Sequence, residues 1–325
     1  MKTPIRPLIT AALLAFGSVA AQAAAPVAPP SPPSPPSPPS QHDWHSRGGD
    51  DYDDAASTID ERRPLKADAK VRISNVAGSV QVSAWDKNEA YVTGELGHGA
   101  EKLDISGSDG NLEIVVKTPK NSRNVSGTDL RVMLPANAVL TIDAVSADVI
   151  VQGIKGKVVA ATVSGELTLS LASDEVEART VSGDVVLKSP TKVCSINTIS
   201  GDVRVTGPSG RLKLETVSGD AELVGGTFSD LSLKSISGDY NVEAALTGDG
   251  RLTGETLSGE MRVRLPQATS ALVSLHTFSG EVRSAFGGGS ASDEERRERK
   301  EFKIGDGRAR VDLSSFSGDI RLEKR

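Results

Sequence analysis

The chain has 325 residues, a formal net charge of −6 and only 3% aromatic residues. Acidic and basic residues are interspersed along it, so the basic face needed to neutralise a phosphate backbone is missing and nucleic-acid binding is excluded. A single cysteine excludes an intramolecular disulfide, and we therefore expect the fold to be held by apolar burial and backbone pairing.

Residues 1–23 are predicted to be a secretory signal peptide. Lys2 and Arg6 precede the apolar run Leu8–Ala21, and Ala21-Gln22-Ala23 has the small-x-small pattern of a cleavage site, with cleavage expected after Ala23. A buried N-terminal helix is the alternative. No cysteine stands directly after this site, so a lipoprotein is not expected, and no later apolar run is long enough for a transmembrane segment. The protein is predicted to be periplasmic, or to be secreted and either released or held at the cell surface.

Two polar segments follow the signal peptide. Residues 24–40 are rich in Ser-Pro-Pro repeats, which favour an extended polyproline II spacer because proline fixes φ and lacks an N–H donor. Residues 41–62 are acidic and contain few apolar residues, a composition typical of a disordered linker. His42 and His45 in this linker could alternatively bind a metal weakly.

A repeat runs through the rest of the chain. A unit of the form hydrophobic-Ser-Gly-acidic recurs, first at a spacing of 18 residues, then at 19 to 21, and a last time after an insertion. Its serines, which we call position 0, are Ser146, Ser164, Ser182, Ser200, Ser218, Ser237, Ser258, Ser279 and Ser317. Positions −6, −4, −1, +3 and +5 are mostly apolar in every unit. One short unit cannot bury its own apolar face, so the repeat predicts stacked coils.

The predicted fold is all-β. It is a repetitive β-solenoid over residues 63–325, with coils of about 18–21 residues, a less regular N-terminal β cap and a charged insertion at 287–301. The only helical candidate is Asp293–Glu301. Positions −6 and −4 are expected to face inward, as are −1, +3 and +5, which requires a kink between the two sets because their offset is odd. Cys194 occupies position −6 and is expected to be a buried hydrophobe.

An acidic residue stands at position +2 of every unit. Carboxylates on neighbouring coils repel one another, so this column needs compensation. We expect it from backbone N–H groups or from the Ser/Thr column at position −2, with arginines such as Arg204 and Arg262 nearby on the same face. Calcium bound along Asp184, Asp202, Asp220 and Asp239 is the less favoured alternative.

The sequence does not suggest an enzyme. The acids are periodic, whereas a hydrolytic site needs an irregular cluster of acid and base groups in a cleft. His98 and His276 are the two histidines beyond the linker, and neither lies in a catalytic motif. No phosphate-binding loop or paired zinc ligands occur, and no cofactor is expected.

The motifs resemble a known family. Val71–Val80, the strand ends Leu134-Pro135 and Leu265-Pro266, and the Val-Ser-Gly-Asp-Val units are similar to the bacterial β-strand-repeat family of unknown function named "putative adhesin", over residues 65–325. The resemblance implies a non-catalytic cell-envelope scaffold or adhesin-like binding protein, whose partner is an envelope polymer or a surface or periplasmic protein. A polysaccharide-active β-helix enzyme, either a lyase or a hydrolase, and a periplasmic component of envelope-stress signalling are the alternatives.

Overall fold

The structure is a computed structural model, and it describes residues 58–97, 102–118, 127–287 and 298–325. These residues belong to one compact unit, Asp54–Arg325. The predicted signal peptide, the spacer and residues 41–57 of the predicted linker lie outside the described residues, as does His98. Every named element of the described part is a strand, so the protein is all-β as predicted. Among the described residues there is no helix with the length and apolar character of a membrane span.

The N-terminal strands are β1 (Thr58–Pro64), β2 (Lys70–Trp85), β3 (Glu89–Glu95), β4 (Lys102–Ser108), β5 (Asn111–Lys117), β6 (Thr128–Pro135) and β7 (Val139–Gln152). The central strands are β8 (Val158–Ala161), β9 (Leu167–Ser170), β10 (Glu175–Arg179), β11 (Val185–Lys188), β12 (Val193–Asn197), β13 (Val203–Thr206), β14 (Gly210–Glu215) and β15 (Ala221–Ser237). The C-terminal strands are β16 (Tyr240–Ser258), β17 (Met261–Leu265), β18 (Ala271–Ser279), β19 (Val282–Ser284), β20 (Arg299–Ile304), β21 (Ala309–Ser317) and β22 (Ile320–Lys324).

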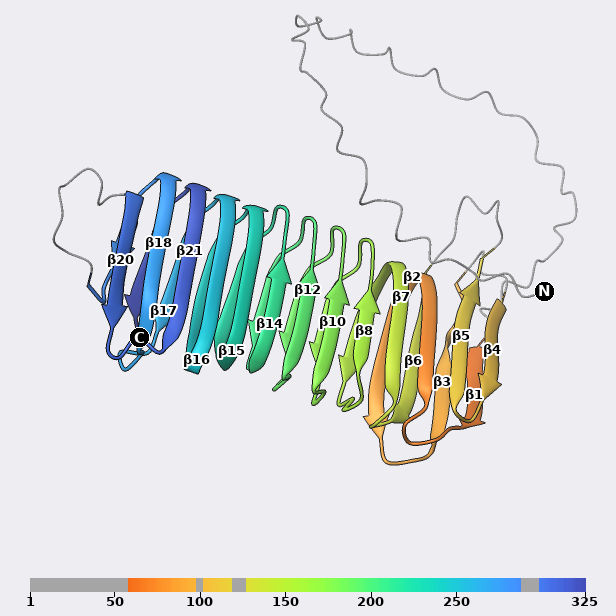
Figure 1. Cartoon of the computed structure of the whole chain (residues 1–325). Helices are drawn as coiled ribbons and strands as arrows, with labels where there is room; N and C mark the ends of the chain where they lie inside the picture. The colour runs from red at the N-terminus through yellow and green to blue at the C-terminus, as the bar shows by residue number, and fades with distance from the viewer. Residues whose placement is uncertain (1–57, 98–101, 119–126, 288–297) are drawn as a thin grey trace, which may run out of the picture. The chain divides into compact units, whose positions relative to one another are not determined.

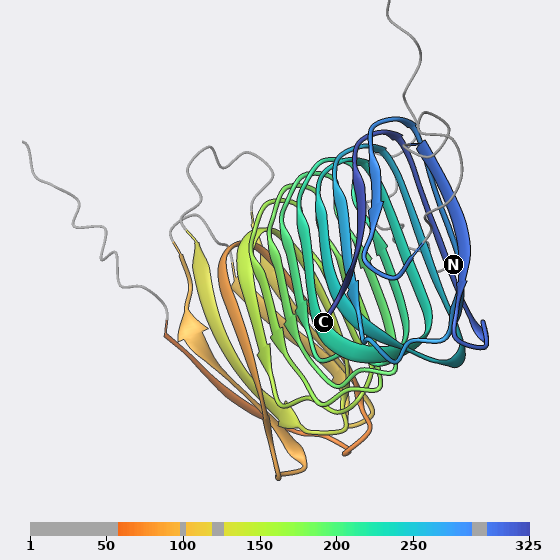
Figure 2. The same cartoon turned by 90° about the vertical axis from the view of Figure 1, so that its left-hand side faces the viewer.

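Successive coils of the central part pair in parallel and in register. Cys194 pairs with Val176 of the preceding coil and with Leu212 of the following one, each 18 residues away. The strands β8, β10, β12 and β14 form one wall in this way, and β9, β11, β13 and the start of β15 form the other (Figure 1). Equivalent repeat positions therefore stack on one another, which confirms the column alignment and gives a solenoid-like arrangement (Figure 2).

The core lies between the two walls. Positions −6, −4, +3 and +5 point inward, and their side chains are almost completely buried, as Val185 and Leu187 illustrate. Fully burying a side chain such as valine or leucine stabilises a fold by about 1.5–3 kcal/mol, so one such set per coil is a large driving force. Cys194 is buried in this core at 2% exposure, as predicted.

The coil that comes first in the chain, which contains β2, is not the outermost coil of the stack. β2 lies between β7 on one side and β5 and β6 on the other, with parallel pairing throughout. Antiparallel strands then cover this end, since β4 pairs with β5, β3 pairs with β6, and β1 pairs with β3. The predicted linker boundary at residue 62 was too late, because residues 58–62 belong to β1, where Ile59 is buried among charged neighbours.

The last coil is also out of sequence order. β21 lies between β16 and β18, and β22 lies between β17 and β19, so the final coil of the chain separates the two coils that precede it. β20 then pairs antiparallel with the outer edge of β18. The helix predicted for Asp293–Glu301 is wrong at residues 299–301, which begin β20, whereas Glu298 is helical and residues 293–297 lie outside the described part.

Candidate functional site

Each coil turns a corner between the two walls at its Ser-Gly step. The residue at position −2 points inward, as buried Thr180 does, and the glycine at +1 is close to the backbone of the adjacent coil, as buried Gly183 is. Positions −1 and 0 between them both point outward. The backbone remains paired here, because the amide of Ser182 donates to the carbonyl of Val163 at 2.9 Å and the amide of Ser200 donates to that of Val181 at 2.8 Å. The predicted kink therefore exists and lies between −2 and +1.

The residues at position −1 are the main departure from the sequence analysis. We expected them to face the core, and this expectation was wrong. Ile236 is 49% exposed, Leu257 52% and Phe278 63%. The reason is the corner itself, since two consecutive residues point outward there and shift the strand's alternation by one.

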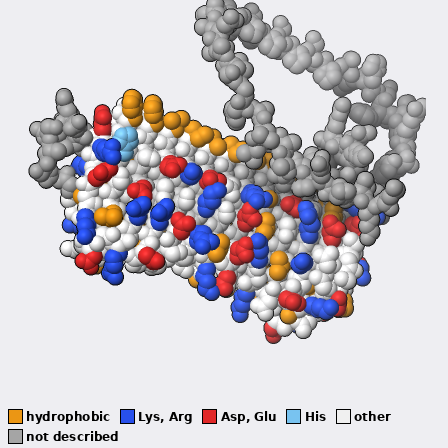
Figure 3. Space-filling view, viewed as in Figure 1, with side chains coloured by type: hydrophobic (Ala, Val, Ile, Leu, Met, Phe, Trp, Pro, Cys, Tyr) orange, Lys and Arg blue, Asp and Glu red, His pale blue; other side chains and the backbone are white. Residues whose placement is uncertain are grey.

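These side chains form a continuous line that we call the apolar ridge. In stacking order it comprises Val76, Val145, Val163, Val181, Ile199, Val217, Ile236, Leu257, Phe316 and Phe278. Figure 3 shows a row of apolar side chains along the upper edge of the coils. The row ends in a stacked pair, with the ring centroids of Phe278 and Phe316 4.9 Å apart. A single exposed apolar residue is normal, but a line of apolar residues outside the core along the whole stack makes the ridge a candidate functional site.

The acidic residues at position +2 form a second line, which we call the acid row. It comprises Asp148, Glu166, Asp184, Asp202, Asp220, Asp239, Glu260, Asp319 and Glu281 in stacking order. The aspartates accept a hydrogen bond from the backbone of the next coil: the amide of Asp202 donates to Asp184 Oδ1 at 2.9 Å and that of Asp220 to Asp202 Oδ1 at 3.0 Å. Backbone N–H groups thus supply the compensation that the sequence analysis expected.

The Ser/Thr column does not serve the acid row. The hydroxyl oxygen of Thr180 accepts from the amide of Gly183 at 2.8 Å, and Thr277 donates to the carbonyl of Gly318 at 3.0 Å, so these two members of the column bind the glycine corner. The hydroxyl oxygens of four other members are buried and have no hydrogen-bond partner in the described part: Thr198, Thr216, Ser235 and Ser315. Arginines contact the acid row at the C-terminal end, where Arg262 and Arg321 both pair with Glu260 at 2.9 and 2.7 Å. Arg204 instead pairs with Glu222 at 2.7 Å.

The four aspartates of the calcium alternative lie together in the acid row. Asp184, Asp202, Asp220 and Asp239 lie on four successive coils as expected, and each uses one oxygen to hold the next coil. Within the described ranges no group of three His, Cys, Asp or Glu side chains could hold a metal ion. His276 is exposed at the outer end of the stack, on β18.

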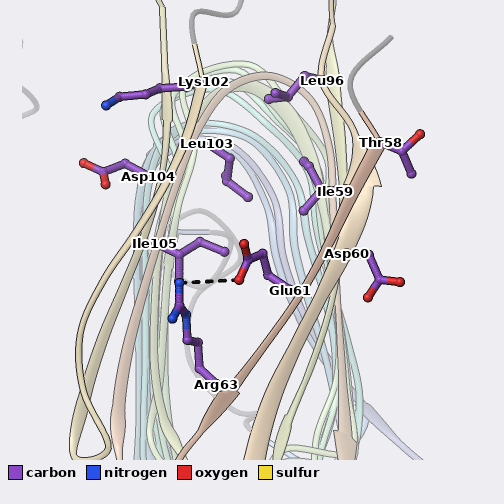
Figure 4. Close-up of a pocket in the computed structure, with 10 residues that line it drawn as sticks. All are labelled: Thr58, Ile59, Asp60, Glu61, Arg63, Leu96, Lys102, Leu103, Asp104 and Ile105. Carbon is purple, nitrogen blue, oxygen red and sulfur yellow. Dashed lines mark ion pairs between the residues drawn. The ribbon is translucent and has the colours of Figure 1, made fainter. Parts of the chain in front are cut away.

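A separate opening lies at the N-terminal end of the core. It has a volume of about 470 Å³ and lies between β1 and β4, with apolar walls from Ile59, Leu96, Leu103 and Ile105. Leu103 and Ile59 lie across it from each other, and an ion pair of 3.4 Å between Arg63 and Glu61 lies at its side (Figure 4). Its charged lining includes Asp104, whose pKa is lowered because Lys117 donates a hydrogen bond to it.

The ridge is the functional feature that sequence reasoning missed. Its signal was present, because apolar positions −6 and +3 differ by an odd number and two successive residues must then face the same way. We assigned position −1 to the core because it is always apolar. Hydrophobicity alone does not say on which side of a corner a residue lies.

The geometry defines an all-β protein of parallel stacked coils with a glycine corner, an apolar ridge and an acid row. Residues 66–323 match the family described as Toastrack DUF4097, and the chain belongs to this family, whose function is unknown. No curated protein matches the chain.

Several solved structures resemble the chain at low identity. A "putative lipid binding protein" from Parabacteroides distasonis is 13% identical with a TM-score of 0.47, covering 82% of this chain and 97% of its own. A "putative adhesin" from Parabacteroides merdae is 9% identical with a TM-score of 0.36 and the same two coverages. A "putative cell adhesion protein" from Clostridium sporogenes is 11% identical with a TM-score of 0.22, covering 83% of this chain and 100% of its own.

Proposed function

We propose that this protein is a non-catalytic binding scaffold of the cell envelope and that the apolar ridge is its contact surface. The observation that carries the proposal is the ridge itself. Its residues are apolar in every coil although none of them is buried in the core. A partner that covers this line removes apolar surface from water, and this burial stabilises the complex by about 25 cal/mol per Å² of apolar surface.

The regular spacing of the ridge supports a long partner rather than a small molecule. Neighbouring strands lie about 4.8 Å apart, so the ridge offers one apolar contact at that interval along the stack. The acids of the acid row are distributed one per coil rather than paired in a cleft, which favours binding over the glycan-cleaving alternative. An envelope polymer or an elongated protein is the class of partner that fits this surface.

The test is co-sedimentation of the purified full chain with sacculi and with outer-membrane vesicles. We expect the wild-type protein to pellet saturably with one of the two fractions. The variant Ile236→Ser/Leu257→Ser/Phe316→Ser should remain in the supernatant, because these side chains are 49–53% exposed and their replacement removes contact surface rather than core.

The control carries equally drastic changes away from the ridge. Met133→Ser/Val193→Ser/Val224→Ser replaces apolar residues that are 39–41% exposed, and it should pellet like the wild type. Equal pelleting of both variants would overturn the ridge as contact surface. Failure of the wild type to pellet with either fraction would overturn the scaffold proposal and favour a soluble signalling role. Repeating the assay with calcium and with a chelator tests the calcium alternative, which requires pelleting to depend on the metal.

A further inference from the structure

The surroundings of the ridge contain information about the chemistry of its partner. On one side, each ridge residue is followed by the exposed serine at position 0 and then by the acid row at +2. The opposite side, at position −3, has no uniform chemistry: Arg179, Asn197, Glu215 and Lys234 occupy it on four successive coils. The ridge therefore has one hydroxyl-and-acid border and one mixed border.

The acid row is not neutralised along its middle. Within the described residues, Asp184, Asp202, Asp220 and Asp239 form no salt bridge, whereas Glu260 and Asp319 further along the row contact arginines. Arg204 interacts electrostatically with Asp202, but its guanidinium donates its hydrogen bond to Glu222. Four successive carboxylates thus lie beside the middle of the ridge.

In each of these aspartates one oxygen is occupied. Oδ1 accepts the backbone amide of the next coil, at 2.9 Å for Asp220 and 2.7 Å for Asp239, and the described part offers no hydrogen bond to the other oxygen. The carboxylates lie just before neighbouring strands, and such charges repel one another by roughly 1 kcal/mol per pair in water. A row of cations placed against the free oxygens would relieve this repulsion.

We propose that the partner bound at the middle of the ridge is a basic amphipathic helix, a segment with an apolar stripe bordered on one side by lysine or arginine. This inference rests on the proposed function and names the partner class. The apolar stripe covers Val181, Ile199, Val217 and Ile236, while the basic side chains meet the acid row. A partner with a phosphate-rich surface would instead bring its own negative charge against these carboxylates.

The repeat distances favour a helix over an extended strand. Coils recur about every 4.8 Å, and an α-helix rises 5.4 Å per turn, so successive turns of a helix lying along the stack remain beside successive coils. Residues on one face of an extended strand recur about every 6.8 Å. This repeat is longer than the spacing of the coils, so the second such residue no longer lies beside the next coil. Four coils extend over about 14 Å, which corresponds to about three helical turns.

The probe is a synthetic 18-residue helical peptide with leucine on one stripe and lysine along its border, labelled for fluorescence anisotropy and titrated with the full chain at low salt. We expect saturable binding that weakens as salt is raised. A matched peptide with glutamate at every lysine position should not bind.

The protein variants separate the two parts of the surface. Asp202→Asn/Asp220→Asn keeps an oxygen that can accept the next coil's amide and removes only charge, and we expect affinity to fall about fivefold for each carboxylate. Asp86→Asn/Asp306→Asn makes the same change in net charge at exposed aspartates outside the acid row and should bind like the wild type. Ile236→Ser/Leu257→Ser should also weaken binding.

Three results would overturn the inference: no binding of the lysine peptide to the wild type, wild-type affinity in Asp202→Asn/Asp220→Asn, or equal binding of the glutamate peptide. The outcome is separable from that of the proposed function. If the ridge variant loses pelleting with sacculi or vesicles while the lysine peptide fails to bind the wild type, the ridge is still the contact surface and the helical cationic partner is wrong.

Discussion

At the scale of single residues, the glycine at position +1 determines how closely the coils can stack. A Cβ atom built on Gly201 would lie 2.2 Å from the carbonyl oxygen of Gly183, and one built on Gly183 would lie 2.0 Å from that of Gly165. The same clash recurs along the column, through Gly219, Gly238 and Gly259. Glycine is required here because backbone meets backbone, and no flexible side chain can move away.

Gly201→Ala is therefore expected to destabilise the protein by at least about 1–3 kcal/mol, the usual range for inserting a methyl group into closely packed structure. The measurement is the midpoint of urea unfolding. Gly110→Ala is the control, because a Cβ at Gly110 meets nothing within 4 Å. A Gly201→Ala midpoint equal to that of Gly110→Ala would show that the coils can separate without loss.

Cys194 gives a second test at this scale. Burial raises the pKa of its thiol to about 12, so at pH 8 the thiol is protonated as well as shielded from solvent. We expect a thiol reagent to label the native protein slowly and the denatured protein rapidly. Fast labelling of the native protein would contradict the placement of Cys194 in the core column.

At the scale of elements, the two ends of the stack are built by inserted coils. β21 pairs with β16 on one side and with β18 on the other, although the chain passes through β18 before it reaches β21. The space between β16 and β18 must therefore be filled by the last coil to be synthesised. This closes the C-terminal end with pairings of long sequence separation, which form late because the loop-closure entropy must be overcome first.

Leu313→Ala tests this order of the coils, in which β21 lies between β16 and β18. Leu313 is buried in β21, and truncating a buried leucine to alanine typically destabilises by about 2–5 kcal/mol. We expect hydrogen exchange to accelerate in β16 as well as in β18, because β21 contacts both. Acceleration in β18 alone would indicate a stack in sequence order, with β21 outside β18.

At the scale of the whole described unit, antiparallel strands cover part of both ends. β1, β3 and β4 do so at the N-terminal end and β20 at the C-terminal end, where a parallel coil would otherwise expose unpaired backbone groups. The ridge and the acid row extend between these ends as parallel lines. A surface of this kind exists only in the assembled stack, because each coil contributes one residue to each line.

The sequence by itself determined the strand content, the repeat and the stacking of equivalent positions. Apolar residues recurring once per unit can be buried only if units stack in register, and for the same reason Cys194 could be placed in the core. The family resemblance rested on the same residues and is confirmed by the match over residues 66–323.

Only the tertiary structure decided the order of the coils at the ends and the direction of the residues at position −1. Repeated units have nearly the same pairing preferences, so the sequence cannot say which of two similar coils lies next to a third. At the corner, the alternation of inward-facing and outward-facing residues is reversed within two residues. Val217 and Leu212 are both apolar, but Val217 is exposed and Leu212 is buried. The side a residue faces is set by where the backbone turns, which is a property of the packed coils and not of the residue's own hydrophobicity.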